Sequence, residues 1–269
     1  MTTQNEAVVA NDPEKGVVSR REALTSAAEK SSRLLTALGV GAIPVALAAL
    51  SRSASAQTTT DLMDGLQFVL FVVQMQSELH LRAAGVSGFI PSADLSAMTA
   101  MRIQDAAQEQ AIGSLITSLN GIPNNKPAFD WTAKGAFPSF SFALGQYSTY
   151  QVIAQGLEDL GVRAFKGQIA RMTANTNVMS QVATYGSIQG RHAAEIRRIR
   201  GKKAWITTSS RDDLPAIFQP VYDGEEVTVH AGYDASALSA NGGLNAVTEA
   251  FDEPLTKVQA NVVISKFLP

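Results

Sequence analysis

The stretch Tyr185–Gly201, YGSIQGRHAAEIRRIRG, decides how the rest of the chain is interpreted. Its apolar side chains recur at helical spacing: Ile188, Ala193 and Ile196. Its last turn is rich in arginine, and Gly201 stands where a helix of this pattern ends. Gln189 and His192 are three residues apart, so both project from one face of the predicted helix. The stretch therefore predicts a helix that carries a polar pair on one side.

The composition is that of an ordinary globular protein. The 269 residues are 45% hydrophobic and 17% charged, which predicts one domain with extensions and a sizeable core. A net charge of −2 gives no indication of a nucleic-acid partner, and we expect none. The chain contains no cysteine, which excludes disulfides, thiolate metal sites and cysteine nucleophiles.

The apolar pattern predicts four long helices. They are expected at Thr58–Ala84, Pro91–Leu119, Ser139–Gly167 and Thr173–Arg200. The first is apolar nearly all round, which is typical of a central helix. Gly161 interrupts the third, where glycine costs about 1 kcal/mol relative to alanine. We therefore expect a neighbouring helix to approach the chain closely at Gly161.

The predicted connection between the second and third helices is long and carries bulky aromatic residues, namely Phe129, Trp131 and Phe137. Such side chains bury large apolar areas, so we expect the connection to pack across the bundle. A long connection at this point is what a bundle needs when the chain must cross from one end to the other.

Residues 1–56 have the pattern of an export signal. Val18-Ser19-Arg20-Arg21 precedes an apolar run, Leu34–Leu50, and a small-residue cleavage pattern follows at Ser53–Ala56. The paired arginines indicate a twin-arginine signal, so we expect export to the periplasm or the extracellular space. The alternative is that Leu34–Leu50 is retained as an anchoring helix, although it is shorter than the roughly 20 residues of a comfortable membrane span.

The chain after residue 203 lacks the long helical pattern of the preceding segments. A turn is predicted at Val221–Glu225 and a strand at Val227–Val229. Glu253-Pro254 is expected to open a closing helix with several apolar side chains on one side: Val258, Val262, Val263 and Phe267. The pattern of residues 204–269 therefore predicts an irregular extension with a short hairpin and a closing helix. We expect this extension to pack on the bundle or on a neighbouring subunit.

A basic cluster marks the end of the fourth predicted helix. It consists of Arg197, Arg198, Arg200, Lys202 and Lys203. One interpretation is a patch for anions or lipid headgroups. The preferred interpretation is that these cations complement the negative end of the helix dipole.

Three segments of the chain together resemble one protein family. They are LQFVLFVVQMQSELHLRA (Leu66–Ala83), GLEDLGVRAFKG (Gly156–Gly167) and the stretch that contains Gln189-x-x-His192. The resemblance is to secreted bacterial ferritin-like domain proteins, a branch related to desiccation-associated proteins. It runs from about Leu62 to Lys203, with a weaker match at EAFDEPLT (Glu249–Thr256). It implies an all-α, ferritin-like four-helix bundle over residues 57–203.

The resemblance also implies where a di-iron centre would lie. Such bundles use one carboxylate from each of two helices and Glu-x-x-His from each of the other two. The matching positions here are Val73 on the first helix, with Gln76 in place of a further acid, Gln108 and Ala111 on the second, Glu158 on the third, and Gln189 and His192 on the fourth. By this correspondence only Glu158 and His192 keep a metal-binding side chain.

One carboxylate and one imidazole cannot hold a dinuclear site, because carboxamides coordinate iron weakly and Val73 and Ala111 cannot coordinate it at all. Replacing acids by glutamine also removes the repulsion that a metal-free core would suffer. We therefore predict that the di-iron centre is lost, that no cofactor is bound and that the protein is not an enzyme. The expected role is structural or in self-assembly, as a homo-oligomer or with another protein partner.

Two alternatives concern the polar residues that remain. Glu158 and His192 could hold one iron or manganese ion in a mononuclear or rearranged site. Gln108, Glu158, Gln189 and His192 could instead form a hydrogen-bonded cluster, with Glu158 ionised against a protonated His192 or sharing one proton with it. His80 could join a mononuclear site, but a surface or partly buried histidine is the preferred interpretation.

Overall fold

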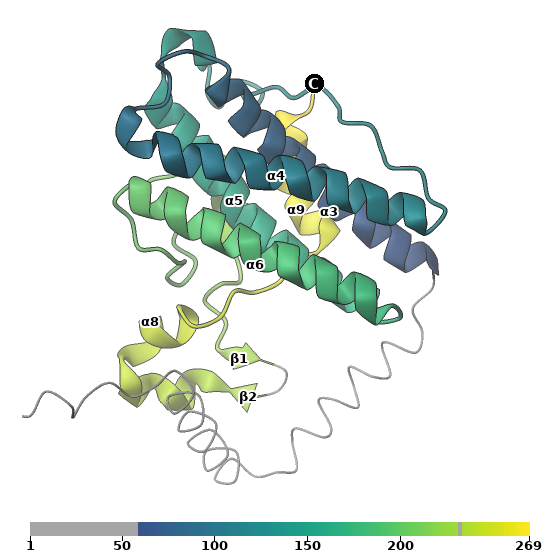
Figure 1. Ribbon diagram of the computed structural model, residues 1–269. Coiled ribbons are helices and arrows are strands. Elements are labelled where there is room, and N and C mark those ends of the chain that lie inside the picture. The colour runs from purple at the N-terminus through teal and green to yellow at the C-terminus, as the bar shows by residue number, and fades with distance from the viewer. Residues whose placement is uncertain (1–58, 231–232) are drawn as a thin grey trace, which may run out of the picture. The chain divides into compact units, whose positions relative to one another are not determined.

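Four long helices form a bundle in the described part of the chain (Figure 1). They are α3 (Thr59–Ala84), α4 (Ser92–Ser118), α5 (Tyr147–Ile169) and α6 (Thr176–Ile199). The computed structural model describes residues 59–230 and 233–269, so the predicted signal segment, residues 1–56, lies outside the described residues. Helices dominate, and the only strands among these residues form one short hairpin, so the predicted all-α class is confirmed.

The helices surround a common interior. α3 packs against α4 and α5, and α6 packs against the same two helices from the other side. Each helix turns one stripe of side chains inward, as α4 does with Met98, Met101, Asp105, Gln108, Ile112 and Ile116. The spacing of three or four residues is what one face of an α-helix requires. Polar residues at two of these positions bring hydrogen-bonding groups into the core.

The connection between α4 and α5 crosses the bundle from end to end, as predicted. The hydroxyl of Tyr147, the first residue of α5, donates to Asp94 in the first turn of α4 at 2.9 Å, so both helices begin at the same end. The connection leaves α4 at Asn120, whose φ of 62° closes the helix. Its aromatic residues are packed, since Trp131 lies 6.1 Å from Phe267 between ring centroids.

The C-terminal part contains short elements that differ from their prediction. They are α7 (Gln219–Tyr222), β1 (Val229–His230), β2 (Tyr233–Asp234), α8 (Gly243–Thr248) and α9 (Lys257–Ile264). The predicted turn at Val221–Glu225 is wrong at its start, because Val221 and Tyr222 end a helix. The closing helix begins after Thr256, whose side chain and Gln259 form a capping box, rather than at Glu253-Pro254.

The predicted apolar side of the closing helix is also wrong. Val263 and Phe267 are buried, but Val258 is 77% exposed and Val262 is also exposed. Each exposed valine is five residues before one of the buried residues. Because an α-helix has 3.6 residues per turn, side chains five residues apart point in clearly different directions. α9 therefore buries a narrower stripe than the sequence suggested.

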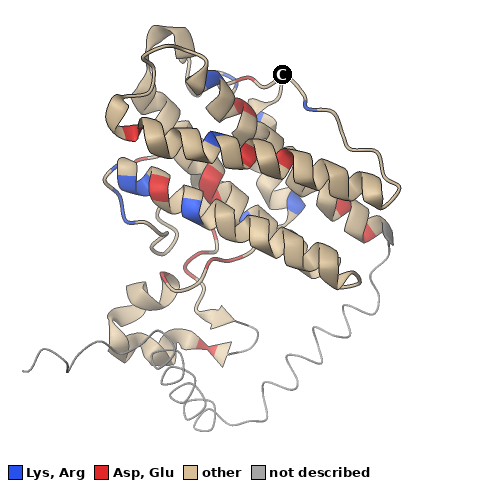
Figure 2. Cartoon of the chain, in the orientation of Figure 1, with Lys and Arg blue, Asp and Glu red and all other residues tan. Residues whose placement is uncertain are grey.

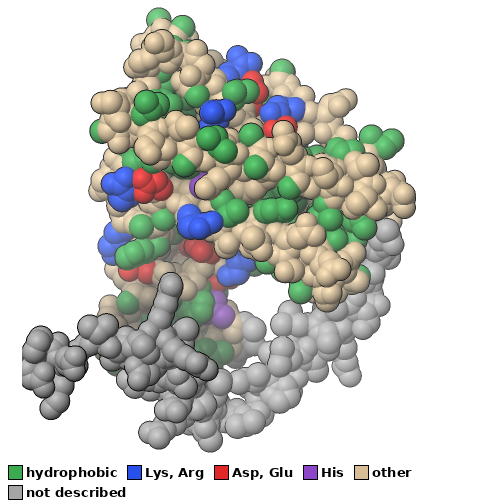
Figure 3. Space-filling view, viewed as in Figure 1, with side chains coloured by type: hydrophobic (Ala, Val, Ile, Leu, Met, Phe, Trp, Pro, Cys, Tyr) green, Lys and Arg blue, Asp and Glu red, His purple; other side chains and the backbone are tan. Residues whose placement is uncertain are grey.

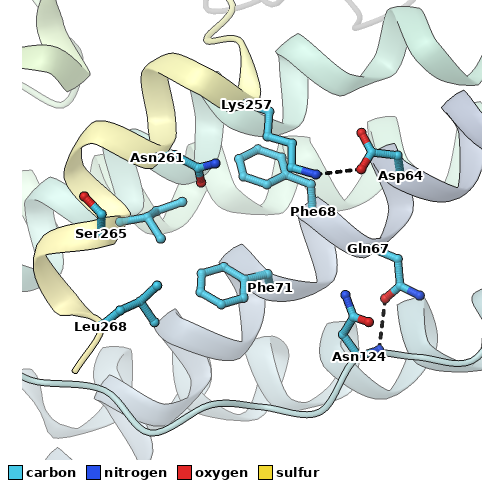
Figure 4. A pocket seen from close by; sticks show the side chains of 10 residues that line it. Asp64, Gln67, Phe68, Phe71, Asn124, Lys257, Asn261, Ser265 and Leu268 are labelled. Atoms are coloured by element: carbon cyan, nitrogen blue, oxygen red, sulfur yellow. Dashed lines mark hydrogen bonds and ion pairs between the residues drawn. The ribbon is translucent and has the colours of Figure 1, made fainter.

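The closing helix forms one wall of a surface groove whose other wall is α3 (Figure 4). Phe68, Phe71 and Leu268 line its apolar floor. At its rim the ammonium group of Lys257 donates to Asp64 at 2.6 Å, which ties α9 to the first turns of α3. An ion pair this exposed contributes little, so the contact with α3 depends mainly on the apolar floor.

One buried arginine fastens the C-terminal part to α5. Arg163 donates to the backbone carbonyls of Val221, Asp223 and Glu253, and forms an ion pair with Glu225 at 2.6 Å. Backbone carbonyls are neutral acceptors that a turn leaves unpaired, so one guanidinium satisfies several of them at once. The extension is therefore held by specific polar contacts as well as by apolar burial.

The basic cluster at the end of α6, blue in Figure 2, forms ion pairs within the chain. Arg197 is buried and forms ion pairs with Asp159 and Asp212. Arg200 and Lys202 pair with Asp213 at 2.8 and 3.2 Å. These cations thus bind acids of the same chain, on α5 and in the segment after α6, a role that neither sequence interpretation included. On the face in Figure 3, basic, acidic and apolar side chains are interspersed rather than gathered into a patch of one sign.

Replacing Gly167 by alanine is expected to destabilise the protein strongly. An added Cβ would lie 1.9 Å from the backbone carbonyl oxygen of Leu255, and backbone cannot move aside as a flexible side chain can. We expect a loss of about 3 kcal/mol in the free energy of unfolding, at the upper end for overpacking, measured by urea denaturation. Gly190→Ala is the matched control, because a Cβ in that helix meets nothing within 4 Å and should stabilise by about 0.5–1 kcal/mol. Equal effects of the two changes would contradict the close contact.

Within the described part of the chain, none of the helices combines the length and the apolar character that crossing a membrane requires.

Candidate metal centre

Four ionisable side chains meet in the bundle interior, one from each long helix. They are His80 from α3, Asp105 from α4, Glu158 from α5 and His192 from α6, and we call them the central cluster. Their exposed fractions are 1%, 0%, 0% and 3%. Residues of this kind are rarely buried unless they are paired or bind a metal.

Each carboxylate of the central cluster lies beside both imidazoles. The Nε2 atom of His80 is 2.9 Å from Glu158 Oε1 and 3.7 Å from Asp105 Oδ2. The Nδ1 atom of His192 is 3.2 Å from Asp105 Oδ1 and 3.7 Å from Glu158 Oε2. Ligand atoms of His80, Asp105 and Glu158 all lie within 4.8 Å of one another. This separation is that of donor atoms around a single small cation.

The outer nitrogen of each histidine is held by a neutral partner. His80 Nδ1 lies 2.6 Å from the hydroxyl of Tyr150, which in turn donates to the sulfur of Met98. His192 Nε2 lies 2.8 Å from the amide oxygen of Gln104, which can only accept. These contacts assign the protons to the outer nitrogens and leave the inner ones to face the carboxylates. Metal-binding histidines are oriented in this way.

The charges of the central cluster are strongly coupled. Burial alone would raise the pKa of Glu158, but its interactions with His192 and His80 outweigh that effect and lower the pKa. Burial would lower the pKa of His192, but Asp105 and Glu158 raise it to about 10. The pKa of Asp105 is raised by burial and by the neighbouring charge of Glu158. Without a metal, Glu158 is therefore ionised against a protonated His192, the first of the two arrangements considered from the sequence.

The metal-free protein is expected to lose stability as the pH rises from about 6.5 to 10. The pKa of His192 is raised from 6.5 to about 10 on folding, so its stabilising contribution is fully present below 6.5 and is lost as the pH passes the folded value. We expect a loss on the order of a few kcal/mol, measured by urea denaturation of chelator-treated protein across this range. A His192→Gln variant should lack this slope, and an unchanged slope in the variant would contradict the assignment.

Three glutamines form a network beside the central cluster: Gln76 from α3, Gln108 from α4 and Gln189 from α6. The amide nitrogen of Gln76 donates to Gln189 at 2.7 Å and to Glu158 at 3.2 Å. The amide nitrogen of Gln189 lies 3.3 Å from the amide oxygen of Gln108. The predicted hydrogen-bonded cluster of Gln108, Glu158, Gln189 and His192 is therefore present, enlarged by Gln76, Asp105 and His80.

Several buried polar atoms of the site lack a hydrogen-bond partner within the described part of the chain. They are Asp105 Oδ2, His192 Nδ1, Gln76 Oε1 and Gln108 Nε2. An orphaned buried polar atom costs about 1–3 kcal/mol, so it calls for an explanation such as an ion or a water molecule. Two of these atoms, on Asp105 and His192, belong to donors of the central cluster.

Comparison with protein families supplies the last observation. Residues 44–202, more than half of the chain, match the model of the ferritin-like domain. The chain belongs to the ferritin-like domain family. No curated protein matches it.

Because the chain belongs to the ferritin-like family, its interior side chains can be compared with those that a dinuclear metal centre needs. Such a centre takes four carboxylates and two imidazoles from the four helices. This ferritin-like chain brings two carboxylates and two imidazoles together, and fills the adjoining interior with carboxamides. The residues present therefore do not fit two metal ions, but the central cluster fits one.

Two of the expected ligand positions in this ferritin-like bundle do not face the central cluster. Val73 is buried in the apolar core, and Ala111 is partly exposed. The interior acid of α4 is Asp105, three residues before Gln108 rather than after it. The interpretation of His80 as a surface or partly buried residue is wrong, because its imidazole is buried among the acids.

A sequence signal could have found both missed residues. On α4, Asp105 is the single acid in a stripe of inward positions at spacings of three and four. On α3, His80 follows Gln76 by four residues and precedes the buried Ala83 by three. Glu109, by contrast, pairs with Lys126 at 2.9 Å outside the interior. The set of inward-facing positions along a helix therefore identifies interior acids better than the spacing of the Glu-x-x-His motif does.

Proposed function

We propose that this ferritin-like protein binds one divalent metal ion, iron or manganese, in the central cluster. The observation that carries the proposal is that four donors converge from four different helices while the outer nitrogen of each histidine is already held. Asp105 Oδ2 lacks a hydrogen-bond partner within the described part of the chain, which a bound cation would explain.

The chemistry of the donors favours this class of metal. Two carboxylates and two neutral imidazoles supply two oxygens and two nitrogens, a mixed set that suits iron and manganese. A divalent ion carries the charge that the two carboxylates need for neutrality, and its binding requires unprotonated inner nitrogens on His80 and His192. Asp105 and Glu158 would hold the ion electrostatically, and the two imidazoles would fix its position.

The proposed role of the ion is to hold the bundle together rather than to catalyse a reaction. All four donors are at most 3% exposed, so a substrate reaches them only if the bundle opens. An ion bound by one side chain from each helix links α3, α4, α5 and α6 at their centre. We therefore propose a structural metal site and no enzymatic activity.

A metal-free structural bundle is the second candidate. It is favoured by the contacts that already serve Glu158: His80 lies 2.9 Å from one carboxylate oxygen and Gln76 donates to the other at 3.2 Å. Such contacts let the interior remain folded without a cation. Under both candidates we propose export of the protein, on the pattern of residues 1–56, and association with itself or another protein.

Elemental analysis of the purified full chain distinguishes the two candidates. The metal-binding proposal expects about one iron or manganese per chain, and Mn²⁺ at 100 times its dissociation constant should stabilise the protein by about 2.7 kcal/mol. Fewer than about one metal per ten chains, with no stabilisation by Mn²⁺ or Fe²⁺, would leave the metal-free bundle. Mass spectrometry of the native N-terminus tests export, since a chain beginning near Gln57 has lost the signal.

A further inference from the structure

We propose that Gln76 and Gln189 limit the site to a single metal ion, because their side chains fill the interior space that a second ion would occupy. The inference rests on the proposed metal-binding function and extends it to the number of ions bound. It concerns two residues outside the central cluster and the glycine that faces them.

The two glutamines form a compact pair against the acids. The amide nitrogen of Gln76 donates to the amide oxygen of Gln189 at 2.7 Å, and both side chains are fully buried. Gln76 also donates to Glu158 at 3.2 Å, and the amide nitrogen of Gln189 lies 3.5 Å from Asp105. On each carboxylate of the central cluster, the pair thus contacts the oxygen that does not face His80.

Gly161 makes room for the pair. A Cβ at this position would lie 2.4 Å from the amide nitrogen of Gln76 and 2.7 Å from the amide oxygen of Gln189. Gly161 lies inside α5, where glycine costs about 1 kcal/mol relative to alanine. Its role is therefore space for the two carboxamides, so the close neighbours are side chains from α3 and α6 rather than the closely approaching helix that the sequence predicted.

The donor count shows what the pair replaces. The central cluster has two acids and two imidazoles, whereas a dinuclear bundle site has four acids and two imidazoles. Gln76 and Gln189 lie on α3 and α6, next to the existing acids, and glutamate has the same shape as glutamine. Two isosteric changes therefore complete the donor set without changing the packing volume.

The experiment is to convert the pair and count metal ions. The variant Q76E/Q189E is prepared in the full chain with Mn²⁺ present, and manganese per chain is measured by elemental analysis beside the unmodified protein. We expect the ratio to double from about one to about two, with an electron paramagnetic resonance spectrum of two coupled Mn²⁺ ions. Q74E is the control, because Gln74 is also buried on α3 but donates to Asn124 away from the cluster. Its ratio should stay at one.

The outcomes separate this inference from the proposed function. One ion in the unmodified protein and one in Q76E/Q189E would overturn the inference and leave the proposed function intact. No ion in the unmodified protein would refute both. The variant buries two further acids, so it is expected to need metal to fold. Folding by circular dichroism on addition of two equivalents of Mn²⁺ supports the inference, and failure to fold with Mn²⁺ overturns it.

A second measurement tests the packing of Gly161. Gly161→Ala should lower the urea midpoint of the unmodified protein, because the new methyl group displaces the paired carboxamides. In a Gln76→Ala background the same change should cost much less, since the closest contact is gone. Equal losses in the two backgrounds would show that Gly161 serves another contact, and would overturn this part of the inference.

Discussion

Glu158→Gln is expected to abolish metal binding while leaving the bundle folded. Glu158 lies in α5 against His80 and the glutamine network, so it is one of the two carboxylates that would bind the ion. Glutamine keeps the shape but removes the charge, and a carboxamide is a weak ligand for iron or manganese. We expect metal content to fall from about one per chain to below about one in ten, measured by elemental analysis, with unchanged far-ultraviolet circular dichroism.

The control for this change is Glu109→Gln. Glu109 is an acid of α4 that pairs with Lys126 outside the interior, so its loss should leave the metal content unchanged. A Glu158→Gln protein that keeps its full complement of metal would contradict the proposed donor set. Loss of metal in both variants would indicate a general effect of charge rather than coordination by Glu158.

Arg197→Met is expected to cause the largest loss of stability among single changes outside the site. Arg197 forms a bidentate ion pair with Asp159, at 2.9 and 2.7 Å, and both side chains are buried. Burial raises the pKa of Asp159, and Arg197 opposes that shift, so removing the cation leaves an acid without compensation. We expect a loss of about 3–5 kcal/mol in the free energy of unfolding, measured by urea denaturation.

Arg198→Met is the matched control for the same helix end. Arg198 pairs with Glu195 at the surface, where an ion pair contributes little, so no measurable change is expected. A double variant with Asp159→Leu as well as Arg197→Met should recover part of the loss, because no buried charge then remains unpaired. Equal effects of Arg197→Met and Arg198→Met would contradict the importance of the buried pair.

Helical spacing predicts much of this molecule. The four long helices follow from it, as do their ends at Asn120 and Gly201, which both have positive φ. The meeting of Glu158 and His192 in the interior is instead what the resemblance to ferritin-like proteins implies, and both side chains are buried there. The helices and their ends depend on residues near one another in the chain, and a local pattern can report them.

The Glu-x-x-His spacing does not predict the interior acid of α4, because it points forward from Gln108 to Ala111. The side chain that faces Glu158 lies three residues in the other direction, at Asp105. Both directions are allowed by a helix, and only the packing of the four helices decides between them. The same argument applies to His80, whose burial depends on its contact with Tyr150 of another helix.

The C-terminal part was the least predictable because distant residues determine it. Arg163 binds three carbonyls that lie 58 to 90 residues further along the chain. No periodic pattern in residues 204–269 predicts such contacts, because the acceptors are backbone atoms of turns. Sequence spacing can predict an irregular segment there, but not the residue that holds it.

The position of Asp159 makes the four long helices dependent on the C-terminal part of the chain. Its carboxylate accepts from the hydroxyl of Tyr222 at 2.5 Å as well as from Arg197. Tyr222 lies in α7, beyond the end of the last long helix at Ile199. A fragment that stops near Lys203 would expose this carboxylate and leave Arg163 without its acceptors. Phe267 is also buried and lies against Trp131, so we expect the smallest autonomous unit to extend through Phe267 and shorter expression products to precipitate.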